Sequence, residues 1–280
     1  MSIRRRLVPV VAGLLVAACT TPTAPPPMTV SATLDPETTL LAHIYAAGLR
    51  YYGTAARVEA VADVMIALDT GNAGVAPGFT GRLLRRLDPE STARSAPSVY
   101  RAMVAALPEG IAAADYATAA EDKPALAVTE ATATRWGSRE LAALVRNCAG
   151  LRVGVLTGDE TAATVGDCTL PPPRAYGDAA SLFGALRTGS LTAAWTTTAD
   201  TRVPDGVVVL VDRKPTLIPA ENVVALYRRN EMNTMALRAV NEIAGVLDTA
   251  ALTEMSRSVK AGADPQAVAE QWLAANPLGR

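Results

Sequence analysis

Histidine, cysteine and aromatic residues are scarce in this chain of 280 residues, which has one histidine, three cysteines and 4% aromatic residues. A Ser-His-Asp or Cys-His site needs a histidine beside its nucleophile. Helical periodicity places the single histidine, His43, on the polar face of the first predicted helix. The chain also lacks the H-E-x-x-H, P-loop, G-x-S-x-G and G-x-G-x-x-G patterns. We therefore expect a protein that is not an enzyme and that uses no cofactor or metal.

The chain also lacks an excess of charge of either sign, because it has 26 Lys+Arg and 27 Asp+Glu residues. Nucleic-acid binding rests mostly on a basic surface, so we expect no nucleic-acid partner. Apolar runs after the N-terminus are strand-sized, such as residues 207–211, and none predicts a membrane-spanning helix. We therefore expect neither a membrane-spanning helix after the N-terminus nor a basic surface that binds nucleic-acid phosphates.

The N-terminus has the pattern of an export signal. Residues 1–18 combine three arginines with a short apolar run, as signal peptides do. The run ends in Val-Ala-Ala followed by Cys19, which resembles a bacterial lipobox, although a plain secretory signal with an incidental cysteine remains open. Residues 19–28 contain four prolines and predict an extended tether. We expect an extracytoplasmic protein that lipid on Cys19 anchors to the cell membrane.

Export also bears on the two remaining cysteines. Cys148 and Cys168 form an even pair in an oxidising compartment, where pairing is the default. A redox or metal site has less support, because neither a C-x-x-C spacing nor histidine partners are present. We predict a disulfide between them.

Strand-like and helical segments alternate along the rest of the chain. The predicted strands are residues 29–33, 125–129, 151–156, 191–197, 207–212 and 223–227. Helices are predicted to begin at the aspartates Asp35, Asp88, Asp178 and Asp264, since aspartate caps helix N-termini well. Residues 235–247 and 249–259 predict two further helices. The alternation predicts α/β layers with largely parallel sheets.

Two charged groups in the sequence have simple interpretations. Arg82, Arg85 and Arg86 fall on one helical face and are interpreted as solvated, with a docking patch for an acidic membrane partner as the alternative. The adjacent acids Glu121 and Asp122 are also expected to be solvated. The sequence leaves open the alternative that two carboxylates from distant segments meet in a cleft.

Several blocks resemble one family, the substrate-binding proteins of ABC importers for glycine betaine, choline and carnitine. The sequence ALDTG…PGFTG looks like the family's A-L-x-x-G…P-E-Y-T-G, and ALAVT is similar to its Y-A-L-A-V strand. The matching blocks are ALDTG (67–71), PGFTG (77–81), ALAVT (125–129), ALRTG to AWTT (185–197), PAENVV (219–224) and AGADPQAVAEQWL (261–273). Their order along the chain agrees with the family pattern.

The resemblance implies an α/β fold of two lobes, the type II periplasmic-binding-protein fold, with two crossover strands as its hinge and the ligand in the cleft. Lobe 1 is expected at residues 29–124 plus 217–280, and lobe 2 at 125–216. The implied function is a monomeric lipoprotein that delivers a quaternary amine, such as betaine, choline or carnitine, or a related small solute, to ABC permease subunits.

A quaternary ammonium is held against aromatic faces, because it donates no conventional hydrogen bond. The resemblance assigns five residues to the ligand site: Phe79, Thr80, Trp195, Thr196 and Asp63. Phe79 matches the tyrosine of P-E-Y-T-G, and Trp195 matches an aromatic position of the family. We expect the rings of Phe79 and Trp195 to face each other from opposite lobes across a cationic guest.

The same carry-over shows departures from the family. Pro124 stands at a family tyrosine, Thr38 at a common glutamine, and Arg82 at the threonine after the glycine. The aromatic cage is therefore incomplete, and Tyr116 or Tyr176 is the candidate to fill it. The alternative function is a repurposed envelope interaction or signalling lipoprotein with a degenerate pocket.

Overall fold

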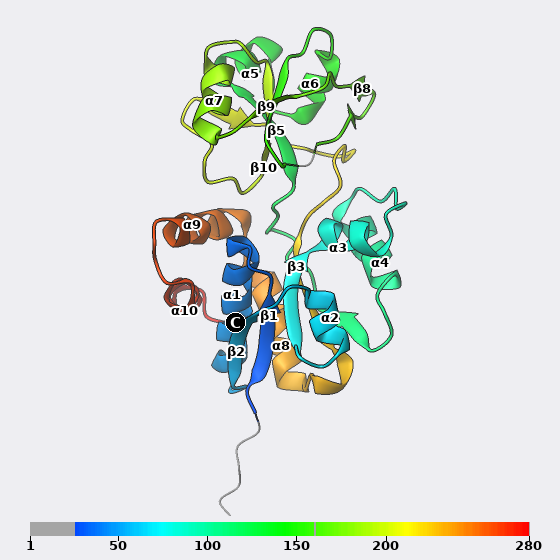
Figure 1. Ribbon diagram of the computed structural model, residues 1–280, viewed down its shortest axis with the longest axis vertical. Coiled ribbons are helices and arrows are strands. Elements are labelled where there is room, and N and C mark those ends of the chain that lie inside the picture. Colours follow the sequence, from blue (N-terminus) through cyan, green and yellow to red (C-terminus); the bar gives the residue numbers. More distant parts are fainter. Residues whose placement is uncertain (1–25, 160, 280) are drawn as a thin grey trace, which may run out of the picture.

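The structure is a computed structural model that describes residues 26–159 and 161–279, so the predicted signal peptide and Cys19 lie outside the described residues. The chain forms two α/β lobes joined by two crossover segments (Figure 1). Within the described ranges, no helix has both the length and the apolar character that a membrane crossing requires.

Lobe 1 consists of a five-stranded sheet with helices on both faces. Its strands are β1 (Met28–Ala32), β2 (Ala56–Ala60), β3 (Val75–Phe79), β4 (Ile111–Ala113) and β12 (Val223–Arg228), in the order β2-β1-β3-β12-β4. Its helical elements are α1 (Pro36–Tyr51), α2 (Val64–Asp69), α3 (Thr80–Leu87), α4 (Ala96–Ala105), η1 (Arg229–Glu231), α8 (Thr234–Val246), α9 (Thr249–Lys260) and α10 (Pro265–Ala275).

Strand β12 shows how the sheet of lobe 1 is buried on both faces. Val223 and Ala225 pack in the core with α1 and α8, whereas Val224 and Leu226 pack in the core with α2, α3 and α4. Successive side chains of a strand point to opposite faces. A strand covered on both sides therefore needs a continuous apolar run, which the sequence of β12 supplies.

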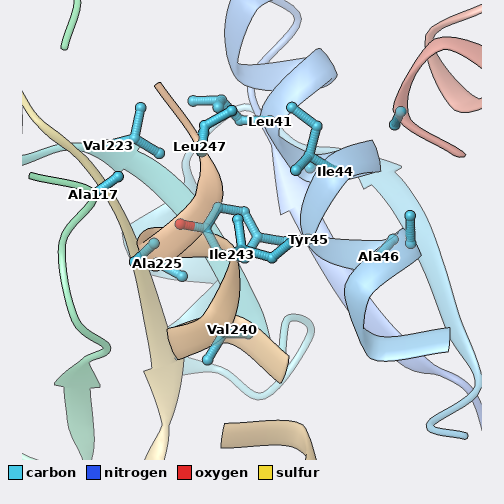
Figure 2. Close-up of a cluster of buried hydrophobic side chains, with 14 of the residues drawn as sticks. Leu41, Ile44, Tyr45, Ala46, Ala117, Val223, Ala225, Val240, Ile243 and Leu247 are labelled. Atoms are coloured by element: carbon cyan, nitrogen blue, oxygen red, sulfur yellow. The ribbon is translucent and has the colours of Figure 1, made fainter. Parts of the chain in front are cut away.

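The core between α1 and α8 is centred on Tyr45, whose side chain is fully buried. Figure 2 shows its ring between the two helices, close to Ile243 and Ala225. Because α8, α9 and α10 all contact α1, that helix is buried on most of its sides. His43 was expected to be solvated, but it is half-buried, and burial is the main cause that lowers its pKa.

Lobe 2 has a second five-stranded sheet in the order β11-β5-β10-β6-β9. Its strands are β5 (Pro124–Thr129), β6 (Val153–Leu156), β9 (Arg174–Tyr176), β10 (Ala193–Thr197) and β11 (Val207–Val209), and a hairpin is formed by β7 (Thr164–Val165) and β8 (Cys168–Thr169). Its helices are α5 (Glu130–Trp136), α6 (Leu141–Arg146) and α7 (Ala179–Arg187). Cys148 and Cys168 form the predicted disulfide within this lobe.

The chain leaves lobe 1 after β4 and returns to it before β12, so β5 and β12 follow the two crossovers (Figure 1). Both strands run antiparallel to their sheet neighbours. The prediction of largely parallel sheets is therefore wrong, and the sheets are mixed. A strand that enters a sheet through a crossover runs in the direction opposite to the strands that βα connections place in that sheet.

The predicted helix starts are correct at three of four aspartates. Asp35, Asp178 and Asp264 each accept a backbone hydrogen bond as N-caps of α1, α7 and α10. Asp88 instead follows the end of α3, and the next helix starts after Ser95, whose side chain caps α4. An Asp-Pro pair closes a helix here because proline also cannot continue one.

Candidate functional site: a charged cleft between the lobes

A cleft of about 920 Å³ lies where the two lobes meet, and both lobes line it. Lobe 1 contributes the start of α1, one face of α3 and the end of α9. Lobe 2 contributes the end of β10 and the loops after β6 and β10. The lining residues are Asp35, Pro36, Glu37, Arg82, Arg85, Arg86, Pro89, Asp122, Pro124, Gly158, Asp159, Trp195, Thr196, Thr197, Ala199, Asp200, Arg202, Glu221, Ser256, Val259 and Lys260.

Helix α3 brings its three arginines to the cleft because contacts with Asn222 and Glu221 fix its first turn. Thr80 is fully buried; its backbone N–H donates to the carbonyl of Asn222, and its Oγ1 accepts from the Asn222 N–H. The carboxylate of Glu221 accepts from the Arg82 N–H at 2.7 Å. An acid at this end satisfies a free N–H and complements the helix dipole.

Arg82 links this helix to two acids at the base of the cleft. Its Nη1 lies 3.1 Å from Glu37 Oε2, and its Nη2 lies 2.8 Å from Asp122 Oδ2. The guanidinium carbon also lies 4.2 Å from the centroid of the Phe79 ring. The arginine is therefore held at once by an aromatic face and by charge-assisted hydrogen bonds.

Burial of the Glu37 carboxyl raises its pKa to about 8, and the charge of Asp122 adds to the rise against the opposing effect of Arg82. Burial also raises the pKa of Glu221, although Arg85 Nη1 lies 2.6 Å from its carboxylate. At neutral pH, Glu37 is therefore mostly protonated.

On the opposite lobe, Asp200 organises the wall of the cleft. Its carboxylate accepts from Thr196 Oγ1 at 2.8 Å and from Arg202 Nε at 2.8 Å. Burial alone would raise the pKa of Asp200, but the hydrogen bonds from Arg202 and Thr196 outweigh burial and lower it. Asp200 is therefore ionised and fixes the positions of both partners.

The two rings expected to face each other do not do so. Phe79 packs in the core of lobe 1 with a 1% exposed surface, and Trp195 packs in a core of lobe 2 with 3%. Trp195 does line the cleft, whereas the face of Phe79 is covered by Arg82. The prediction of two opposed rings is wrong, so a transport function has to rest on other features.

The other predicted site residues divide between the cleft and its supports. Thr196 lines the cleft. Thr80 is one of the buried supports of α3, and Asp63 caps α2 while its Oδ2 lies 2.6 Å from Arg86 Nη2. Tyr116 packs against Tyr100, and Tyr176 packs in the core with α7. Neither tyrosine is among the residues that line the cleft.

Sequence reasoning missed the acidic half of the site. Glu37 was not singled out, and Asp122, expected to be solvated, is 5% exposed and accepts from the Ala199 N–H. The arginines of α3 are exposed along the cleft, as the sequence predicted for a solvated face, and each of them also forms an ion pair with an acid. A signal was present in Asp122, because it stands two residues before Pro124, where a crossover was expected.

Over the described ranges, no group of three or more histidine, cysteine, aspartate or glutamate side chains is placed to hold a metal ion. Four acids of the cleft, Glu37, Asp122, Asp200 and Glu221, are instead paired with arginine side chains, and the last three also accept from backbone N–H groups.

Comparison with known proteins agrees with this architecture. Residues 178–275 match the family model described as the substrate binding domain of ABC-type glycine betaine transport system. This span contains the last three blocks of the sequence resemblance, which is thereby confirmed. No curated protein sequence matches the chain significantly.

Solved structures share the fold across nearly the whole chain. A crystal structure of a glycine betaine/carnitine/choline ABC transporter is 17% identical with a TM-score of 0.74, covering 89% of this chain and 98% of that one. Apo YehZ from Escherichia coli is 19% identical with a TM-score of 0.70, covering 90% and 99%. A choline binding protein in complex with choline is 15% identical with a TM-score of 0.53, covering 89% and 88%. The chain has the predicted two-lobed type II binding-protein fold.

Proposed function

We propose that this chain is the solute receptor of an ABC importer and carries a small polar solute of the betaine, choline and carnitine class, or a related one, to its permease. The observation that carries the proposal is the cleft of about 920 Å³ lined by both lobes. Binding proteins close two lobes around a ligand by a hinge, and the two crossovers of this chain provide one. The match of residues 178–275 to a glycine betaine transport family supports the same function.

The proposed organisation of the chain follows from this function. Lobe 1 would comprise residues 29–124 plus 217–280, and lobe 2 residues 125–216. Lipid on Cys19 would anchor a monomer to the outer side of the membrane, where it meets permease subunits. The proposal includes no catalytic step, and it assigns Asp122, Glu221 and Asp200 to ion pairs that hold the walls of the cleft.

Ligand binding tests the proposal directly. The mature protein without its lipid is screened by thermal shift against glycine betaine, choline, carnitine and proline betaine, and against polar amino acids and polyols. Positive solutes are then titrated by calorimetry, since a ligand that binds only the folded state raises its stability. We expect at least one specific solute, and its binding should reduce the radius of gyration measured by X-ray scattering.

The contrary result is also defined. Silence across the whole panel, together with recovery of a protein partner other than permease subunits from membrane extracts, would favour the interaction lipoprotein with a degenerate pocket. A solute that binds without any change in the radius of gyration would remove the hinge from the mechanism.

A further inference from the structure

We propose that Arg82 determines the specificity of the cleft as an internal cation: its guanidinium occupies the cation site that Phe79, Glu37 and Asp122 form, so that a solute with a quaternary ammonium group is excluded there. The inference rests on the proposed function, since it concerns which solute the cleft accepts. It makes Arg82 a specificity-determining residue and assigns the wild-type protein a solute that is recognised by hydrogen bonds.

The geometry around Arg82 is that of an occupied cation site. An aromatic face lies 4.2 Å from the guanidinium carbon. Carboxyl oxygens of Glu37 and Asp122 lie 3.1 and 2.8 Å from its nitrogens, and the Asp122 backbone carbonyl accepts a further bond at 3.3 Å. Ring faces and carboxylates are the two groups that attract an organic cation in proteins. The place is filled from within the chain.

A free quaternary ammonium cannot displace this arginine easily. The guanidinium donates hydrogen bonds to three oxygens, whereas a trimethylammonium group donates none. Arg82 is also tethered to α3, which gives it an effective concentration that a dissolved ligand at micromolar level does not reach. Displacement would leave the guanidinium of Arg82, whose side chain is 40% exposed, without its partners.

The opposite lobe does not compensate for the lost aromatic face. Among the described residues that line the cleft, Trp195 is the single aromatic one. The wall around it includes Thr196, Thr197, Asp159 and Arg202, whose side chains can donate or accept hydrogen bonds. Such a wall suits a small solute with hydroxyl, carboxylate or primary amine groups in place of a methylated ammonium.

Removing Arg82 should therefore convert the site. In Arg82→Ala, the Phe79 face and the Asp122 carboxylate become available to a cation from the cleft. One recovered cation–π contact contributes about 0.5–2 kcal/mol, which corresponds to roughly 2- to 30-fold in affinity. We expect choline to bind the variant roughly tenfold more tightly than it binds the wild type in calorimetry. Guanidinium chloride at low concentration should compete with choline in the variant.

Three further variants make the result specific. Arg82→Thr provides a second opening of the site if Arg82→Ala unfolds, as judged by its melting curve. Phe79→Leu in the Arg82→Ala background keeps most of the apolar volume but removes the ring face, and it should abolish the gain. Arg86→Ala removes a cleft arginine that stacks on no aromatic ring of residues 26–159 and 161–279, and it should give no gain for choline.

The outcomes separate this inference from the proposed function. If folded Arg82→Ala and Arg82→Thr bind choline no better than the wild type does, the inference is wrong. It is equally overturned if the wild type binds choline tightly and loses that binding on removal of Arg82. In both cases a solute that binds the wild type leaves the transport function standing. A gain in the variants beside a wild type silent to every solute would contradict the transport function alone.

Discussion

Lys123 Nζ lies 2.9 Å from Asp212 Oδ2, with side chains 6% and 3% exposed, and this buried ion pair joins the two crossover segments. Lys123 stands directly before β5, and Asp212 follows β11. The Asp212 carboxylate also accepts from the Leu217 and Ile218 N–H groups. The pair therefore fixes one crossover to the other at the proposed hinge.

Lys123→Ala should lower the free energy of unfolding by about 3–5 kcal/mol, because it leaves the buried Asp212 carboxylate without its counter-ion. Urea unfolding followed by circular dichroism measures the change. Arg139→Ala removes the exposed pair with Glu130 in lobe 2 and should cost less than about 1 kcal/mol. Equal costs for the two variants would show that the crossover pair is not desolvated.

Stability should fall as pH rises from 5 to 9, and Glu37 should account for much of the slope. Its pKa is raised from 4.5 to about 8 in the folded state, so between these values the native state binds a proton that the unfolded chain has lost. The stabilising contribution is complete below pH 4.5 and disappears as pH passes 8. The groups that face Glu37 are Arg82, Asp122 and Asp35.

Urea unfolding at pH 6 and pH 9 tests this slope. In Glu37→Gln, the difference in the free energy of unfolding between the two pH values should be smaller by a few kcal/mol than in the wild type. A residual slope of the same sign should remain, because burial also raises the pKa values of Glu121 and Glu221. Glu254→Gln on the exposed face of α9 is the matched control and should leave the slope as it is. A free energy of unfolding that rises between pH 6 and pH 9 in the wild type would contradict the raised pKa of Glu37.

The Cys148–Cys168 disulfide should stabilise lobe 2 by about 3 kcal/mol, because it closes a loop with a sequence separation of 20. Cys148→Ser combined with Cys168→Ser should lower the unfolding midpoint accordingly. Neither cysteine lines the cleft, so the affinity for any solute found by screening should stay within about twofold. A larger loss of affinity would mean that the disulfide positions the cleft wall.

The fold was more predictable from the sequence than the site, for a physical reason. Strands such as residues 223–228 and helices capped by Asp35 or Asp264 depend on local runs and caps, and they lie close to where they were predicted. Strand β2 has the sequence ARVEA and was missed. It lies at the edge of the sheet, where it pairs with β1, and its side chains are half-buried or exposed, so it lacks the apolar run that marks an inner strand.

The site depends on contacts between residues that are far apart in the chain, and these contacts have no local pattern. Arg82 meets Glu37 and Asp122 across 45 and 40 positions. The family resemblance singled out Phe79, but it could not show that the ring is buried in the core of lobe 1 and that an arginine three residues later covers its face. A cation in the chain itself changed the role of that aromatic residue.

Gly81 provides the last prediction, because it lets α3 approach the strand segment that precedes β12. A Cβ atom at Gly81 would lie 2.5 Å from the Ala220 carbonyl oxygen and 2.8 Å from the Glu221 carboxyl carbon. Backbone cannot yield as a flexible side chain does, so Gly81→Ala should destabilise the protein by about 1–3 kcal/mol. It should also move Arg82 and Arg85 away from Glu221 and weaken solute binding.

Gly184 in α7 is the matched control, since a Cβ atom there would meet nothing within 4 Å. Gly184→Ala should stabilise the protein by about 0.5–1 kcal/mol, because alanine loses less entropy in a helix than glycine does. Opposite signs for the two substitutions in thermal unfolding, with solute affinity reduced in Gly81→Ala alone, would establish that the close approach of α3 shapes the cleft. If Gly81→Ala is neutral, α3 has room to shift, and the ion pairs of Arg82 and Arg85 alone hold it in place.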